Sequence, residues 1–239
     1  MIKDFDLNNL KCEYLIIGSG AGGAVASKYL TDRGKDVILI EEGDRYEINQ
    51  FKTSISKSFL YAWRNGGITP VISKSNYGYG EGRCLGGGTY INGGLVWRTP
   101  DIVLEKWNGL FDTNIFDKKN LDIYFEEIEK KLEINQIIND EYENKESLKL
   151  LEIGKKNNIK VAKVPNSINS SLEDNKLILG AAGNAKNSIL QRYIHASEKK
   201  GLKVITGCKA LKILTDKNMV KSVKVKFNNE ISHIKPKNL

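Results

Sequence analysis

The sequence is poor in cysteine, histidine and proline, and it has no long apolar run. Its three cysteines, Cys12, Cys84 and Cys208, stand far apart without a CxxC pair, so neither a zinc site nor a disulfide framework is predicted. No segment approaches the roughly eighteen consecutive apolar residues of a membrane-spanning helix. The N-terminus lacks the apolar core of a signal peptide, and we therefore expect a reducing, cytoplasmic location.

The charge of the chain is one-sided but diffuse. The 37 Lys and Arg residues outnumber the 29 Asp and Glu residues, and the formal net charge is +8. The basic residues, nearly all lysines, form no dense block and are not interleaved with aromatic residues. A nucleic-acid-binding protein would concentrate them in a stripe, so a solvated, lysine-rich surface is favoured and no nucleic-acid partner is expected.

The N-terminal part predicts one βαβ unit. Residues 13–17 (EYLII) and 37–40 (VILI) are typical of buried parallel strands, and residues 21–33 between them predict a helix that Gly34 ends. Strand patterns after Val204 predict a small antiparallel meander near the C-terminus. The predicted fold class is α/β, a Rossmann-like domain with a parallel sheet and that meander.

Between the first strand and the helix lies the glycine cluster GSGAGG. Gly18, Gly20 and Gly23 fit the pattern G-x-G-x-x-G, in which each glycine has a separate role. The first permits a tight turn, the second lets the backbone approach a diphosphate, and the third lets the helix pack against the strand. The helix N-terminus would then bind the phosphates of a dinucleotide.

Glu41 follows the second strand at the interval expected of a ribose-binding acid. Its carboxylate can accept hydrogen bonds from a ribose 2′-OH and would repel a 2′-phosphate, which disfavours NADP. Glu42 is adjacent, but strand alternation lets only one of the two face the ribose. This pattern alone does not separate NAD from FAD.

The rest of the chain gives weaker predictions of local structure. Residues 50–80 are expected to be extended and loop-rich, because glycines interrupt every period. The final residues 233–239 (HIKPKNL) show no core-forming pattern. Further predictions are a short helix at 101–107, an amphipathic helix at 121–132 capped by Asn120, a polar loop at 135–147 and a helix at 186–200.

A second glycine cluster, within residues 80–100 (GEGRCLGGGTYINGGLVWRTP), would offer unhindered N–H groups beside a ligand. It closely resembles the signature GR-x-LGG-x-S/T-x-x-NG of the glucose-methanol-choline (GMC) oxidoreductases. Residues 14–43 resemble the FAD fingerprint of that family, and residues 183–214 resemble its helix-to-strand approach to the adenine. The segment RTP at 98–100 is similar to the bacterial branch near gluconate dehydrogenases, cholesterol oxidases and long-chain alcohol oxidases.

The resemblance, which covers about residues 11–227, implies a role for each matching position. The FAD diphosphate would be held by Gly18, Ser19, Gly20, Ala21, Gly22 and Gly23, and the adenosine ribose by Glu41. The loop beside the flavin would be shaped by Arg83, Gly86, Gly87 and Gly88. The flavin ring and ribityl chain would be approached by Asn92, Gly93 and Leu95, and the adenine by the backbone of Ala210.

Two positions in this motif depart from common family choices. Gly88 stands where many members have Ser or Thr, although the neighbouring Thr89 could supply the hydroxyl. Ile91 stands where some members carry a histidine that tethers the flavin. Because isoleucine has no nucleophile, we expect FAD to be bound non-covalently.

The family's chemistry depends on a C-terminal histidine, which accepts the hydroxyl proton while hydride passes to flavin N5. His195, expected on a helix, and His233, expected in a polar tail, both lack that context, so no catalytic residue and no metal ligand is assigned. Family members are also much longer. We expect residues 1–239 to be the N-terminal FAD-binding region, with a core at 11–100 and 178–228, a helical excursion at 101–177 and the catalytic half absent.

The expected function is therefore the FAD-binding part of an oxidoreductase that acts on the CH–OH group of an alcohol substrate. One alternative is a non-catalytic flavin-binding fragment or subunit that needs a second chain. Another is an NAD-dependent Rossmann dehydrogenase, against which the single βαβ unit and the second glycine cluster argue. Without a positioned base, this chain alone is expected to be inactive towards alcohols.

Overall fold

The computed structural model describes residues 7, 10–46, 54–134, 145–168, 186–217 and 219–239. The chain divides into two compact units. The first unit contains the described residues of 1–93 and 188–239, and the second contains those of 94–168 together with 186–187.

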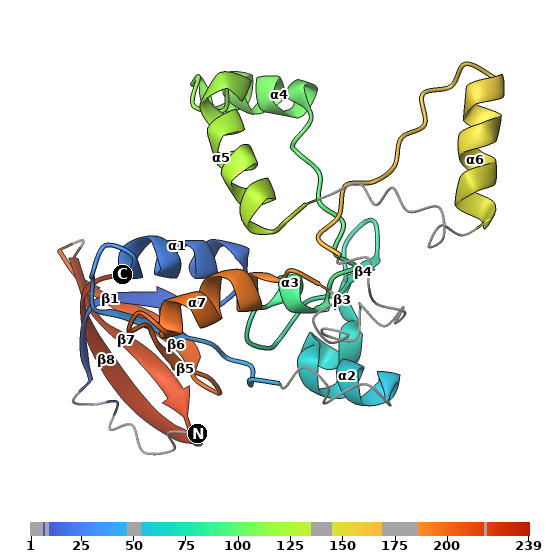
Figure 1. Ribbon diagram of the computed structural model, residues 1–239. Coiled ribbons are helices and arrows are strands. Elements are labelled where there is room, and N and C mark those ends of the chain that lie inside the picture. Colours follow the sequence, from blue (N-terminus) through green and yellow to red (C-terminus); the bar gives the residue numbers. More distant parts are fainter. Residues whose placement is uncertain (1–6, 8–9, 47–53, 135–144, 169–185, 218) are drawn as a thin grey trace. The chain divides into compact units, whose positions relative to one another are not determined.

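A six-stranded mixed sheet forms the centre of the first unit, in the order β5-β2-β1-β8-β7-β6 (Figure 1). Strands β5, β2, β1 and β8 pair in parallel, whereas β8, β7 and β6 pair antiparallel. The bounds are β1 Lys11–Ile17, β2 Val37–Ile40, β5 Lys203–Ile205, β6 Lys209–Asp216, β7 Met219–Phe227 and β8 Glu230–Asn238. The predicted α/β class with a parallel sheet and an antiparallel meander is confirmed.

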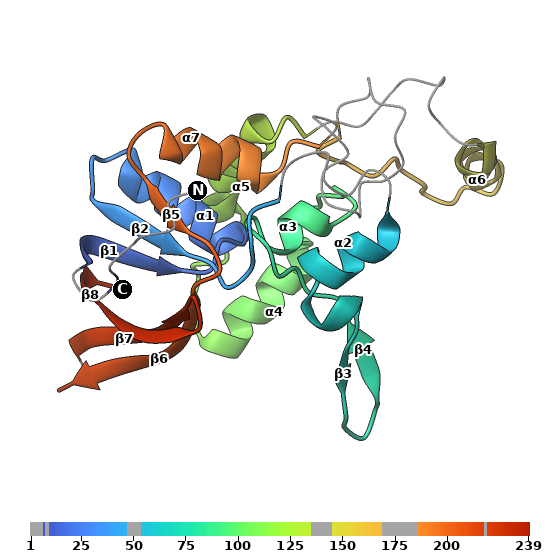
Figure 2. The same cartoon turned by 90° about the horizontal axis from the view of Figure 1, so that it is seen from below.

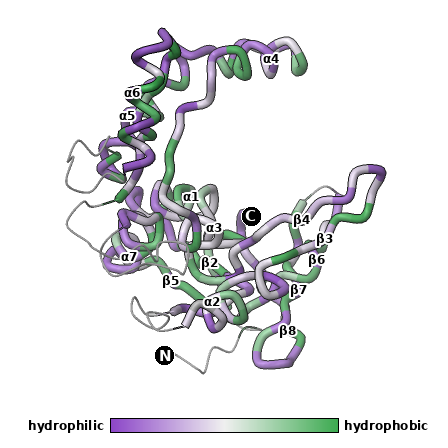
Figure 3. Tube along the Cα trace, turned by 90° about the vertical axis from the view of Figure 1, so that its right-hand side faces the viewer, coloured by the Kyte–Doolittle hydropathy of each residue, from purple (hydrophilic) through white to green (hydrophobic). Residues whose placement is uncertain are grey.

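The βαβ unit forms as the sequence predicts. All four residues of β2 are buried, and its trace carries the hydrophobic colour in Figure 3. Helix α1 (Ala21–Thr31) connects β1 to β2, and Gly34 follows it with a φ of +70°. The left-handed conformation at Gly34 lets the chain reverse into β2 without a Cβ penalty.

The hydrophobic core of this unit is formed by residues from both ends of the chain. Leu15 and Ile38 from the βαβ unit are buried together with Val223, Val225 and Ile234 from the meander. All three cysteines are buried. Burial raises the pKa of Cys12 to about 11 and that of Cys208 to about 12, so both are protonated, unreactive thiols at neutral pH.

The C-terminal segment is the largest departure from the sequence predictions. Residues 233–239 showed no core-forming pattern, yet most of them belong to β8, which lies between β1 and β7. Ser232, Ile234 and Pro236 are buried, while Ile231 and Lys235 are exposed. The alternation of a strand is therefore present, but a serine and a proline occupy buried positions and hide it. His233 accordingly lies half-buried on a strand, and the prediction of a polar tail was wrong.

The predicted loop at residues 50–80 is also more ordered than expected where it is described. Helix α2 (Ile55–Ala62) is capped by Ser54, whose side chain accepts a hydrogen bond from the Lys57 N–H at 3.3 Å. A 3₁₀ turn at Arg64–Gly67 follows, and strands β3 (Thr69–Val71) and β4 (Tyr77–Tyr79) form a narrow hairpin (Figure 2). These elements are too short to give a hydrophobic period.

The second unit contains the two helices expected in the middle of the chain, with different bounds: α4 at Asp101–Phe111 and α5 at Lys118–Lys131. A third helix, α6 at Lys145–Lys156, was not predicted. Asn120 is not the cap of α5, because its amide donates to the Asn114 carbonyl at 2.9 Å and the helix begins after Asp117. The expected loop at 135–147 becomes helical at Lys145, and residues 135–144 lie outside the described residues.

Arg98 joins the start of the second unit to α5. Its guanidinium donates to both carboxylate oxygens of Glu129, at 2.7 and 2.6 Å, and to Asp122 at 3.1 Å.

The helix at Lys186–Lys200 was predicted too long, since a π-helical segment at Leu190–Ile194 leads into α7 (His195–Glu198). No helix among the described residues has the length and apolarity that crossing a membrane requires.

The role of β8 in the core can be tested with two isoleucines of the same strand. Ile234 is fully buried, so Ile234→Ala should lower the free energy of unfolding by about 2–5 kcal/mol through lost burial and the cavity left behind. Ile231 is 49% exposed, and Ile231→Ala should cost less than about 1 kcal/mol. Urea denaturation measures both values. Equal, small effects would show that β8 is not part of the core.

Candidate functional site

The two glycine clusters, far apart in sequence, lie against each other beyond the carboxyl ends of β1 and β2. A Cβ placed on Gly87 would lie 3.0 Å from the Cα of Gly20, so the two backbones approach each other closely. Leu85 N–H donates to the Asp44 carbonyl at 2.9 Å, which attaches the second cluster to the segment after β2. Ligands of open α/β sheets bind at such carboxyl ends.

The glycines of the first cluster differ in their surroundings. Gly18 has a φ of +88°, which supports the predicted tight turn. A Cβ on Gly23 would lie 1.9 Å from the Gly18 carbonyl oxygen, so only glycine lets α1 pack this closely on the turn. By contrast, a Cβ on Gly20 would meet nothing within 4 Å. The open space beside Gly20 is where a diphosphate contact is predicted.

The hydroxyl of Ser19 connects both clusters to Glu41. Ser19 is fully buried, and its Oγ accepts a hydrogen bond from the Gly86 N–H at 2.9 Å. The same hydroxyl donates to Glu41 Oε2 at 2.6 Å, and the Ser19 N–H donates to that oxygen at 3.0 Å. Glu41 Oε1 accepts from the Gly43 N–H at 2.8 Å. These bonds fix the orientation of the Glu41 carboxylate beside the glycine turn.

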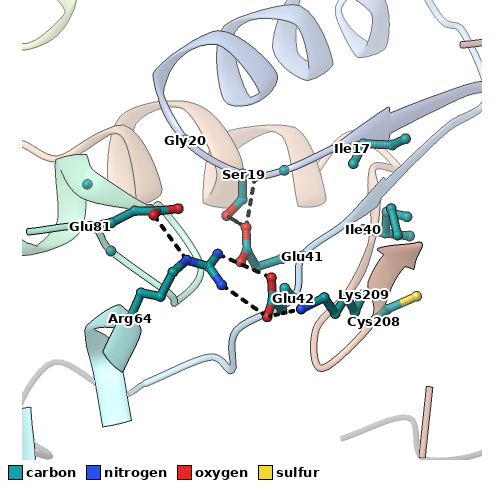
Figure 4. A pocket seen from close by; sticks show the side chains of 15 residues that line it. Ile17, Ser19, Gly20, Ile40, Glu41, Glu42, Arg64, Glu81, Cys208 and Lys209 are labelled. Atoms are coloured by element: carbon teal, nitrogen blue, oxygen red, sulfur yellow. Dashed lines mark hydrogen bonds and ion pairs between the residues drawn. The ribbon is translucent and has the colours of Figure 1, made fainter. Parts of the chain in front are cut away.

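A cavity of about 350 Å³ opens between these segments (Figure 4). The predicted site residues that line it are Gly18, Ser19, Gly20, Glu41, Gly87, Gly88 and Ala210. The first turn of α1 begins beside it at Gly20, with no side-chain cap and no acidic residue. Its N–H groups are therefore available to an anionic ligand.

Other predicted residues lie elsewhere. Ala21 and Gly22 are exposed on the outer face of α1 and line a separate, open apolar hollow. Asn92 and Gly93 follow the short helix α3 (Gly88–Ile91), and they do not line the cavity. Leu95 belongs to the second unit, where it bridges to Asn166.

Gly86, Gly23, Arg83 and Thr89 support the loops without lining the cavity. The Thr89 hydroxyl donates to the Gly86 carbonyl at 2.7 Å, so it holds the second cluster together. The Arg83 Nε lies 3.4 Å from Glu42 Oε1. Neither histidine lines the cavity, because His195 begins α7 and His233 lies on β8, where its Nδ1 is 3.5 Å from Ser222 Oγ.

Both Glu41 and Glu42 line the cavity, and that only one of them faces a ribose stays a prediction. Strand β2 ends at Ile40, so the alternation rule no longer governs the next two residues. Figure 4 shows the two carboxylates turned to different partners: Glu41 towards Ser19, and Glu42 towards Arg64 and Lys209.

Sequence reasoning missed Arg64, Glu81 and Lys209, which also line the cavity. Arg64 donates to both oxygens of Glu42 at 3.2 Å, and its Nε lies 3.0 Å from Glu81 Oε2. Burial alone would raise the pKa of the Glu42 carboxyl, but hydrogen bonds from Arg64 and Lys209 hold that pKa below its usual value. Charged residues in short loops give no periodic signal, so only the folded contacts identify them.

The Ser19 link can be tested against a second buried serine. Ser19→Ala should lower the free energy of unfolding by about 1–3 kcal/mol, because it leaves the buried Gly86 N–H without its acceptor. Ser27 is equally buried, and its Oγ has no hydrogen-bond partner among the described residues, so Ser27→Ala should be neutral or stabilising. Chemical denaturation of both variants gives the comparison. A Ser19→Ala protein as stable as Ser27→Ala would contradict the link.

Comparison with known proteins identifies a family model and several relatives. The family model of the GMC oxidoreductases matches residues 12–238. An uncharacterized GMC-type oxidoreductase of Sinorhizobium fredii is 39% identical over 124 residues, which are 51% of this chain and 25% of that protein. A long-chain-alcohol oxidase of Arabidopsis thaliana is 24% identical over 217 residues, which are 90% of this chain and 28% of that protein.

Among solved structures, the crystal structure of pyridoxine 4-oxidase from Mesorbium loti has the same fold. Its TM-score is 0.72 at 12% sequence identity, and the match covers 95% of this chain and 48% of that chain. This chain spans only about a quarter of the length of the two curated relatives, 25% and 28%. Because the family model matches nearly the whole chain, this protein belongs to the GMC oxidoreductase family.

Proposed function

We propose that this chain binds FAD non-covalently in the cavity between its two glycine clusters. We further propose that residues 1–239 act as the FAD-binding part of an oxidoreductase for the CH–OH group of an alcohol. Family membership supports the cofactor, and the similarity to the Arabidopsis long-chain-alcohol oxidase supports an alcohol as the substrate class. The observation that carries the proposal is the Ser19 link, which holds both clusters and Glu41 around one cavity.

The residues around the cavity fit the ADP half of FAD. The diphosphate would lie at the N-terminus of α1. There, an added Cβ on Gly20 or Gly88 would have no atom of the described residues within 4 Å. Glu41 Oε1 accepts one described hydrogen bond, so it keeps acceptor capacity for a ribose hydroxyl. The start of β6, at Lys209 and Ala210, would lie beside the adenine.

The flavin of bound FAD would supply the chemistry, since it accepts hydride from the alcohol carbon. The residues of this chain would bind and orient the cofactor, and we assign none of them as the base that removes the hydroxyl proton. His195 and His233 are not at the cavity. We propose non-covalent attachment because Ile91 is a buried alkyl side chain and Cys84 is fully buried, with its Sγ 3.8 Å from the Gly87 carbonyl oxygen.

The variant Gly20→Val tests the binding site. The φ of Gly20 is −66°, which valine can adopt, and the added Cβ would meet no protein atom within 4 Å. The variant should therefore fold, yet its side chain would occupy the diphosphate position and FAD binding should fall below detection. Binding is measured by quenching of FAD fluorescence, and folding by circular dichroism.

A matched control is Gly109→Val, the same substitution in helix α4 of the second unit. Gly109 also has nothing within 4 Å of an added Cβ and is exposed. FAD affinity should remain that of the original chain. If the Gly20→Val protein is folded and binds FAD as well as the control does, the proposed site is wrong.

A further inference from the structure

Glu42 lies at the centre of a cluster of positive charge beside the proposed ribose site. Arg64 donates to its two oxygens at 3.2 Å, the Lys209 Nζ lies 3.0 Å from Oε1, and the Arg83 Nε lies 3.4 Å from the same oxygen. These cations come from three separate segments of the chain. Only the folded structure brings them to one carboxylate, next to Glu41.

Glu42 is the acidic residue that these three cations share. Among the described residues, Glu42 is the one carboxylate within ion-pair distance of Lys209 and of Arg83. Arg64 has a second acidic partner, Glu81. The side chains are 23 to 49% exposed, so the pairs contribute little to stability. Their consequence is local: they occupy cations that would otherwise face a ligand.

Free cations near a ribose change the preference of a dinucleotide site. A basic side chain beside the ribose accommodates a 2′-phosphate, whereas a carboxylate on the 2′-OH excludes it. Glu41 is the second kind of group, but Lys209 and Arg83 without their partner Glu42, together with Arg64, would oppose its effect. The pocket therefore needs a second acid if it is to reject a 2′-phosphate.

We propose that Glu42 is a specificity-determining residue, which excludes ligands with a 2′-phosphate by pairing with Arg64, Arg83 and Lys209. The proposal rests on the proposed function, because it takes the ribose of the cofactor to lie against Glu41. Glu41 binds the ribose hydroxyls, and Glu42 keeps the surrounding cations occupied. The two successive acids thus have different tasks at the same end of the cavity.

Two isomeric probes test this proposal: adenosine 5′-diphosphate and adenosine 2′,5′-diphosphate. They have the same atoms and differ in where the second phosphate is attached. Binding to each is measured by calorimetry at one fixed ionic strength. The original chain should prefer the 5′-diphosphate. In Glu42→Gln the affinity for the 2′,5′-isomer should rise about tenfold relative to the 5′-isomer, the size of one charge-assisted hydrogen bond.

The matched control is Glu81→Gln. This substitution changes the net charge by the same amount and removes one of the two acidic partners of Arg64. It leaves Lys209 and Arg83 paired with Glu42. Its preference should stay near that of the original chain. The double variant Glu42→Gln/Lys209→Met removes one of the cations that Glu42→Gln releases. It should lose most of the gain in relative affinity for the 2′,5′-isomer. Glu42→Ala repeats the measurement if the Gln variant does not fold by circular dichroism.

The outcomes separate this proposal from the proposed function. A gain in Glu42→Gln that is absent from Glu81→Gln supports the role of Glu42. Equal gains in both variants would show that the change in net charge alone causes the effect, and would overturn the proposal. No gain in a Glu42→Gln protein that still binds the 5′-diphosphate would also overturn it, while leaving the proposed function intact. If the original chain binds neither probe, the proposed function itself fails.

Discussion

The site depends on one buried hydroxyl. Ser19 occupies the second position of the G-x-G-x-x-G turn, and its Oγ accepts from the second glycine cluster while it donates to Glu41. The cavity between them has the N-terminus of α1 on one side and the fixed carboxylate of Glu41 on the other.

The two successive glutamates lie just after the end of β2, and their carboxylates face different partners. The carboxylate of Glu41, buried and held by N–H and O–H donors, faces the glycine turn. The carboxylate of Glu42 faces Arg64 and Lys209. A continuous strand would send one of them to the opposite face of the sheet, but β2 ends at Ile40 and the chain turns. Both glutamates consequently line the same cavity.

The sequence predicts the elements that carry a strong local pattern. The apolar run VILI and the glycine spacing are enough to place β1, α1 and β2, together with the turn at Gly18. Strand β8 was missed because Ser232 and Pro236 take buried positions next to Ile234, so its composition looks polar. Arg64 was missed because its position depends on contacts with Glu42 and Glu81, which no period in the sequence reports.

The most direct test of the account is an NMR titration of the ¹⁵N-labelled chain with adenosine 5′-diphosphate. If the cavity binds the ADP half of FAD, the amide signals of Ser19, Gly20, Gly87 and Lys209 should shift together and give one dissociation constant, since all four residues line it. Shifts confined to the outer face of α1, around Gly22 and Val25, would place the ligand in the other hollow. That result, or no shift at all, would contradict the central claim.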